Sequence, residues 1–100
     1  MYKRQVYNNN IPISFNLYQN FPNPFNPVTV IKYDLPKDIK VTVKIYDLLG
    51  KEVTTLINNE FKHAGSYELN WYAGNYASGV YIYRIEAGDY INTKKMVLLK

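Results

Sequence analysis

Catalytic chemistry in this sequence would depend on very few side chains. His63 is the single histidine, and the chain has no cysteine. Nucleophilic catalysis requires a serine, threonine or cysteine beside a base that a third group orients. His63 precedes Ala64 and Gly65, a composition typical of a loop, and we interpret it as an exposed loop residue. The sequence therefore predicts no catalytic residue and no enzyme activity.

The eight carboxylates also lack the spacing of a metal site. The sequence contains neither a D-x-D-x-D-G calcium loop nor a glycine-rich phosphate loop. Asp47 precedes Leu48, Leu49 and Gly50, and aspartate at such a position commonly bonds backbone amides within a turn. We expect no metal and no small-molecule cofactor. A calcium site built from loop aspartates and backbone carbonyls stays open as an alternative.

The charge pattern argues against a nucleic-acid partner. The chain carries 12 basic and 8 acidic residues, which gives a net charge of +4. Nucleic-acid-binding domains of this size show a dense basic stripe that is rich in arginine. Here the only arginines are Arg4 and Arg84, and the one local concentration of lysines is Lys94, Lys95 and Lys100.

Tyrosine is unusually frequent, with 11 residues. Four tyrosines alternate with polar residues in strand-like segments and are expected in the core, where tyrosine buries a large area: Tyr33, Tyr67, Tyr81 and Tyr83. Three others fall at expected strand ends or in loops: Tyr72, Tyr76 and Tyr90. If exposed, these three would offer aromatic faces to a sugar, so a carbohydrate-binding sandwich stays open as an alternative.

The elements that must position these side chains have the two-residue period of β-strands. Residues 28–35, 40–46, 51–57, 67–71, 80–87 and 90–100 are the main segments of this kind. We expect loops at residues 47–50 and 58–60, and a tight turn at Gly88 and Asp89. The pattern predicts an all-β sandwich of about seven antiparallel strands with Trp71 buried. Residues 1–14 are interpreted as a linker or fragment edge, and residues 15–100 as one domain.

A proline-rich segment precedes the first long strand. It reads Phe21-Pro22-Asn23-Pro24-Phe25-Asn26-Pro27. Proline fixes φ, and asparagine side chains bond local backbone groups, so such a segment is ordered before it meets the sheets. We predict a rigid loop that is held on the sandwich, with Phe21 and Phe25 as its anchors.

Several segments together resemble one family. They are LYQNFPNPFNPVTVI at residues 17–31, VKIYDLLGKEV at 43–53, AGSY at 64–67 with Trp71, ASGVYIYRI at 77–85, and TKKMVLLK at 93–100. In this order they resemble the type A C-terminal sorting domains of the type IX secretion system. The same signature is similar to the immunoglobulin-like domain of flagellar hook-capping proteins, a relative in fold.

The resemblance implies an immunoglobulin-like sandwich that serves as a non-catalytic export signal. A larger cargo protein, attached covalently on the N-terminal side, would reach the periplasm of a Gram-negative-type bacterium by a cleaved signal peptide. The outer-membrane secretion machinery would then recognise the domain, and a cell-surface sorting protease would remove it. The cargo would be secreted or attached to lipopolysaccharide at the cell surface. The alternative is an extracellular structural or carbohydrate-binding module.

The late motifs of the resemblance indicate candidate residues for recognition by the secretion machinery. They are Gly79, Tyr81, Lys94, Lys95 and Lys100. Structural roles compete with this interpretation: a turn for the glycine, core packing for the tyrosine, and a solvated strand end for the lysines. Two adjacent lysines on one strand cannot both face the core, because successive side chains point to opposite faces.

Overall fold

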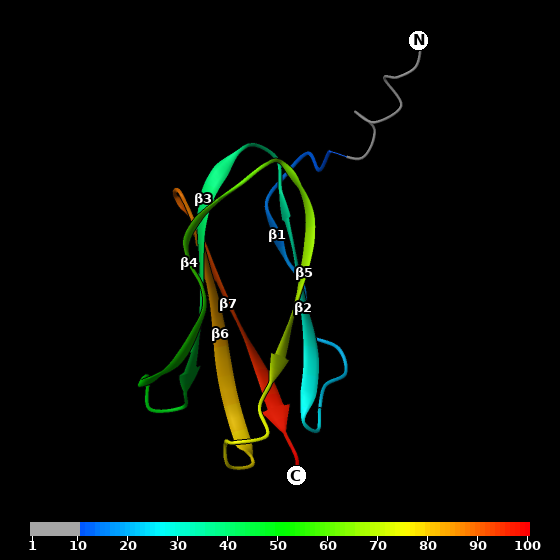
Figure 1. Cartoon of the computed structure of the whole chain (residues 1–100), viewed down its shortest axis with the longest axis vertical. Helices are drawn as coiled ribbons and strands as arrows, with labels where there is room; N and C mark the ends of the chain where they lie inside the picture. Colours follow the sequence, from blue (N-terminus) through cyan, green and yellow to red (C-terminus); the bar gives the residue numbers. More distant parts are fainter. Residues whose placement is uncertain (1–10) are drawn as a thin grey trace.

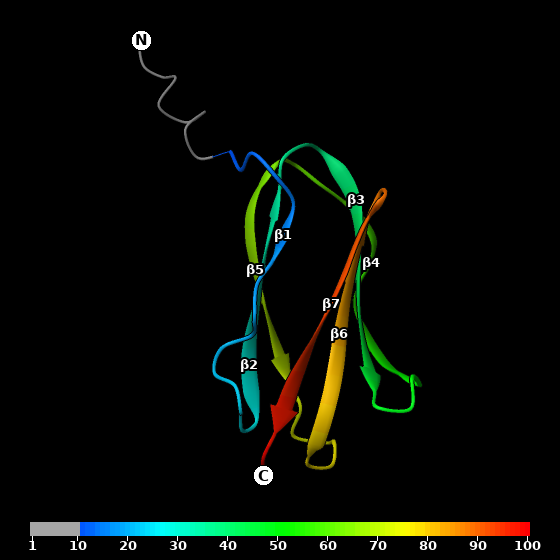
Figure 2. The ribbon, with the colours of Figure 1, turned by 180° about the vertical axis from the view of Figure 1, so that it is seen from behind.

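Alternating apolar and polar side chains produce strands throughout residues 11–100, the part of the chain that the computed structural model describes. The strands are β1 (Asn16–Leu17), β2 (Val28–Leu35), β3 (Ile39–Asp47), β4 (Glu52–Lys62), β5 (Gly65–Tyr72), β6 (Gly79–Ala87) and β7 (Tyr90–Leu98). The order β1-β2-β5 forms one sheet, and β4-β3-β6-β7 forms the other (Figures 1 and 2). The strand pairs in both sheets are antiparallel, which confirms the predicted β-sandwich. Residues 1–10 of the expected linker lie outside the described residues.

The core lies between the sheets, where the inward side chains of each strand meet. Ile31 and Leu35 of β2 and Val43 of β3 have no exposed surface. Each such side chain stabilises the fold by about 1.5–3 kcal/mol through the removal of apolar area from water. Trp71 is 4% exposed, which confirms its predicted burial. Among the described residues, no helix has the length and apolar character needed to cross a membrane.

The β3–β4 hairpin depends on one aspartate and one glycine, as the sequence predicts. The Asp47 carboxylate accepts hydrogen bonds from the backbone amides of Leu49 and Lys51, both at 2.9 Å. Gly50 donates its amide to the Asp47 carbonyl at 3.0 Å and has a φ of 85°. A side chain is strained at that positive φ, so the turn requires glycine.

The expected loop at residues 58–60 is wrong, because β4 continues through it to Lys62. The register between β3 and β4 shifts at three places, and Asn59 has a positive φ of 51°. Its amide donates to the hydroxyl of Thr42 at 3.0 Å. A bulge admits an extra residue into an antiparallel pair, so turn-favouring asparagines remain inside a strand.

The buried hydroxyl of Tyr83 connects the two sheets. The Tyr83 hydroxyl donates to the Tyr18 carbonyl at 2.6 Å and accepts from the Asn20 amide at 2.8 Å. The Asn20 side chain donates to the hydroxyl of Thr29 at 2.9 Å. Asn20 and Thr29 are themselves buried, and these bonds supply the partners that buried polar groups require.

Stability is expected to fall at alkaline pH because two tyrosines, Tyr33 and Tyr83, are buried in the core. Burial raises the pKa of Tyr33 and of Tyr83 to about 12, whereas the pKa of tyrosine in an unfolded chain is about 10. Above about pH 10 the unfolded chain releases protons that the folded chain keeps. The stabilisation is therefore complete below pH 10 and is lost as the pH rises to the folded pKa.

Denaturant unfolding at a series of pH values tests this expectation. The free energy of unfolding should decline between about pH 10 and 12. The free energy of unfolding of the Tyr83→Phe variant should decline less steeply, because that variant has one fewer buried tyrosine with a raised pKa. A free energy that stays constant over this pH range would contradict the prediction.

Candidate recognition surface

The proline-rich segment and the last strand meet in the structure. We call residues 19–27 the strap. The amide of Phe25 donates to the Val97 carbonyl at 2.9 Å, and the amide of Leu99 donates to the Phe25 carbonyl at 3.0 Å. The Asn23 side chain accepts from the Val97 amide at 2.9 Å, and that of Gln19 donates to the Lys95 carbonyl at 2.7 Å. The strap therefore lies along the outer edge of β7 and pairs with its end.

The two predicted anchors of the strap differ. Phe25 is 2% exposed, and its ring lies 5.8 Å from that of Trp71. Phe21 is 78% exposed. Phe21 is held through its backbone instead, since its amide and carbonyl both bond Val30 at 3.0 and 2.9 Å. Phe25 thus anchors by burial of its ring, and Phe21 only by its main chain.

An aromatic cluster below the strap contains one of the candidate recognition residues. The ring of Trp71 lies 5.6 Å from those of Tyr76 and Tyr81. Tyr81 is 8% exposed, and its hydroxyl donates to the Ala77 carbonyl at 2.7 Å. The buried side chain of Tyr81 therefore packs beneath the strap and is not accessible to a partner.

Two other candidates lie at the same end of the sandwich, near the C-terminus in Figure 1. Gly79 begins β6 and pairs with Leu98 of β7. The Lys100 amide donates to the hydroxyl of Ser78 at 2.9 Å. The Lys100 ammonium donates to the carbonyls of Gly74 at 2.8 Å and Tyr76 at 3.0 Å. These contacts join the end of the chain to the turn before β6.

The structure separates the two adjacent lysines of β7. Lys95 is exposed on the outer face of the four-stranded sheet, whereas Lys94 is half-buried on the side of Met96 and Leu98. Lys95 pairs with Ile82, and Lys94 pairs with Tyr83. The fold thus brings Gly79, Tyr81 and Lys100 together at the strap, and leaves only one of the two remaining candidates on the outer face.

Sequence reasoning missed the two polar side chains that bond the strap to β7. Asn23 and Gln19 reach Val97 and Lys95, which are 74 and 76 positions away in the chain. The only signal in the sequence was the local one, since asparagine and glutamine bond backbone groups readily. Nothing in the local pattern specifies a partner so far along the chain.

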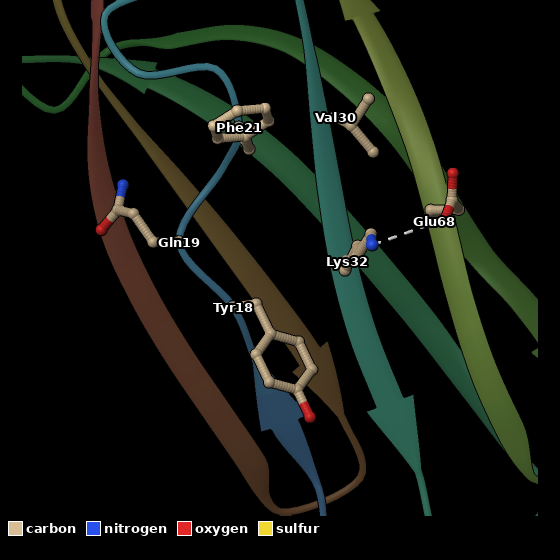
Figure 3. Close-up of a pocket in the computed structure, with 6 residues that line it drawn as sticks. All are labelled: Tyr18, Gln19, Phe21, Val30, Lys32 and Glu68. Atoms are coloured by element: carbon tan, nitrogen blue, oxygen red, sulfur yellow. Dashed lines mark ion pairs between the residues drawn. The ribbon is translucent and has the colours of Figure 1, made fainter. Parts of the chain in front are cut away.

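A hollow lies on the outer face of the three-stranded sheet. It is a shallow groove of about 620 Å³ that is lined by Tyr18, Gln19, Phe21, Val30, Lys32 and Glu68 (Figure 3). Beside it, the Asp34 carboxylate accepts bonds from Tyr18, Ser66 and Asn16. Burial raises the pKa of Asp34, but these three hydrogen bonds outweigh it and hold the pKa below its ordinary value.

The tyrosines considered for sugar binding do not form one exposed face. Tyr72 is 61% exposed. Tyr76 packs against Trp71, and Tyr90 stacks on Phe15 with ring centres 4.9 Å apart. Of the three tyrosines that could have offered free rings, Tyr76 and Tyr90 therefore have rings in contact with other aromatic residues.

The single histidine lies in the connection between β4 and β5. His63 has a side chain that is 79% exposed, as predicted, and its Nδ1 lies 3.4 Å from the Asp38 carboxylate. The Ala64 amide lowers the pKa of Asp38 most, and the hydrogen bond from His63 lowers it further. Within residues 11–100, no group of three histidine, cysteine, aspartate or glutamate side chains could hold a metal ion.

Comparisons with known proteins identify the family. Residues 19–99 match the family described as the secretion system C-terminal sorting domain. Comparison with curated proteins gives no match. The fold is similar to part of dimeric latent PorU from Porphyromonas gingivalis, with a TM-score of 0.63 and 24% identity over 81% of this chain. That match spans only 9% of the PorU chain. The family match covers most of the sequence, and the chain therefore belongs to the C-terminal sorting domains of the type IX secretion system.

Proposed function

We propose that this domain is a non-catalytic signal that directs a covalently attached N-terminal cargo protein across the outer membrane through the type IX system. The observation that supports it most is the junction of the strap with the end of β7, made by Phe25 and Asn23. Two family motifs that are remote in sequence form one continuous surface there. A surface made by both motifs gives a receptor a shape that exists only in the folded domain.

The proposed destination is the cell surface or the medium, reached through the periplasm. The partners in this proposal are the outer-membrane secretion machinery and a sorting protease at the cell surface, which separates the domain from its cargo. Family membership supports both partners. The segment before Phe15 is the one that such a protease would cut, because Phe15 packs on Tyr90 and Leu17 is buried, so cleavage there spares the sandwich.

The candidate residues divide into two roles in this proposal. Lys95 is exposed and would contact the machinery directly. Gly79 and Tyr81 would position the strands that carry the signal, since Gly79 pairs with Leu98 and Tyr81 is buried. Lys100 would do both, because its ammonium bonds the turn before β6 while its side chain remains exposed.

Export of a fusion protein tests the proposal. A reporter with a cleaved signal peptide is joined to residues 15–100 and produced in a type IX-competent bacterium. The fused reporter should appear at the cell surface or in the medium, and the reporter alone should stay in the periplasm. A strain that lacks the translocon is the control, and it should retain both reporters.

Two results would contradict the proposal. Equal export of the reporter with and without residues 15–100 would show that the domain carries no signal. Export of the fusion from the strain without the translocon would show that another route carries it. The structural-module alternative would then explain the fold better.

A further inference from the structure

The outer edge of β7 is already occupied where the export signal is expected. An edge strand normally offers its free amides and carbonyls to an added strand. Here the strap uses the backbone of Val97 and Leu99, and Gln19 uses the carbonyl of Lys95. A receptor that added a strand along this stretch would first have to break four hydrogen bonds and expose Phe25. Recognition through side chains meets no such obstacle.

The outward side chains of β6 and β7 form a mainly apolar surface beside this closed edge. Val80 lies opposite Val97, and Ile82 lies opposite Lys95 across the strand pair. The apolar members are half-buried apart from Leu99, which is 55% exposed and lies at the next outward position. We call Val80, Ile82, Lys95, Val97 and Leu99 the outer patch. Half-buried apolar side chains beside an exposed leucine and a charged residue combine the apolar centre and polar rim of a protein-binding surface.

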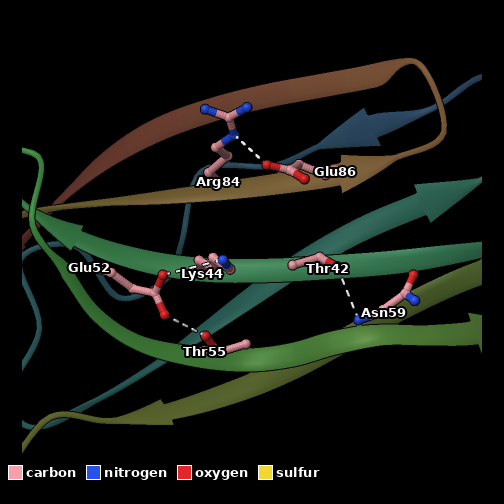
Figure 4. A network of polar contacts seen from close by, with 7 residues as sticks. All are labelled: Thr42, Lys44, Glu52, Thr55, Asn59, Arg84 and Glu86. Atoms are coloured by element: carbon pink, nitrogen blue, oxygen red, sulfur yellow. Dashed lines mark hydrogen bonds and ion pairs between the residues drawn. The ribbon is translucent and has the colours of Figure 1, made fainter.

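Lys95 has no carboxylate partner on the described part of this face, whereas two other cations of the sheet are paired. The ammonium of Lys44 lies 3.2 Å from Glu52, and the Arg84 guanidinium lies 2.9 Å from Glu86 (Figure 4). Glu52 also accepts the hydroxyl of Thr55 at 2.8 Å. Both carboxylates are therefore engaged with other side chains of this sheet. Lys95 makes no ion pair among residues 11–100, so its charge is available to an incoming carboxylate.

We propose that the outer patch is the surface that the secretion machinery recognises, and that its partner is a protein surface with an apolar centre and a carboxylate placed to meet Lys95. This inference rests on the proposed function and specifies which face performs it. Charge complementarity and the closed edge together favour side-chain recognition by a protein. A lipid surface fits less well, because each basic residue contributes only about 1 kcal/mol to binding an anionic membrane and the outer patch contains a single cation.

Export of reporter fusions that carry single changes in the patch tests the inference. Lys95→Glu and Leu99→Asn should each lower the exported reporter about tenfold, the effect of losing one important interface contact. Lys95→Arg keeps the charge and should be exported like the original. Lys37→Glu and Phe61→Asn are matched controls at the opposite end of the sandwich. Lys37 is exposed and Phe61 is 57% exposed, and both variants should be exported normally.

Thermal unfolding of each purified variant separates recognition from folding. The five variants should melt close to the original chain, since the changed side chains are exposed or rim positions. Normal export of both Lys95→Glu and Leu99→Asn, with export still dependent on residues 15–100, would overturn the inference and leave the proposed function intact. Export without residues 15–100 would instead contradict the proposed function itself.

A membrane partner is tested with vesicles that contain phosphatidylglycerol. The purified chain should not sediment with them. Sedimentation that is lost in Lys95→Glu would assign the outer patch to lipid and overturn the protein partner.

Discussion

Replacing Phe25 with alanine is expected to lower the free energy of unfolding by about 3–5 kcal/mol, the range for removal of a buried aromatic ring. Phe25 is 2% exposed, and its ring lies 5.8 Å from that of Trp71. Removal of the ring therefore leaves a cavity beside Trp71. The strap would also lose its buried contact with the sandwich, which frees the edge of β7. Denaturant unfolding followed by Trp71 fluorescence measures both the stability and the local change.

Phe21→Ala is the control for this prediction, because it makes the same chemical change four residues earlier. Phe21 is 78% exposed, and its backbone bonds to Val30 do not depend on the side chain. The free energy of unfolding should change by no more than about 0.5 kcal/mol. Similar costs for the two variants would contradict the assignment of Phe25 as the buried anchor.

Replacing Tyr83 with phenylalanine is expected to lower the free energy of unfolding by about 1–3 kcal/mol, the penalty for leaving a buried polar group without a partner. The lost hydroxyl accepts from the Asn20 amide and donates to the Tyr18 carbonyl, so two backbone groups are orphaned at once. The residue has no exposed surface, and water cannot replace the hydroxyl without opening the core.

Tyr81→Phe is the comparison for Tyr83, since it also removes one hydroxyl from β6. The Tyr81 hydroxyl donates to the carbonyl of Ala77, an exposed residue in the turn before β6. Water can reach that carbonyl, so the variant should lose only about 0.5–1.5 kcal/mol. Denaturant unfolding of both variants measures the difference, and a larger cost at Tyr81 would contradict the role given to Tyr83.

The sandwich was predictable because its strands obey a local rule. Ile31, Tyr33 and Leu35 alternate with polar residues, and all three are buried as the two-residue period requires. The turn at Asp47 and Gly50 was predictable for a similar reason, since both residues carry their conformational preference with them. At residues 58–60 the same reasoning failed, because pairing with β3 outweighs the turn preference of Asn58 and Asn59.

The candidate surface was less predictable than the fold, since it depends on contacts between distant residues. Phe21 and Phe25 have nearly the same local sequence, yet only the second meets Trp71. Alternation shows that Lys94 and Lys95 face opposite ways, but only the register with β6 shows which one faces outward. The contact of Asn23 with Val97 has no local signal at all.

The strap contacts also determine at which stage the fold of the domain is complete. Asn23 and Val97 are 74 positions apart, and Gln19 and Lys95 are 76 apart. Contacts between such distant residues form late, because closing a long loop costs entropy before the contact stabilises it. The outer patch therefore reaches its final shape only in chains that have been synthesised through β7 and have folded. A receptor selective for that shape would accept only chains that extend through β7 and whose sorting domain has folded.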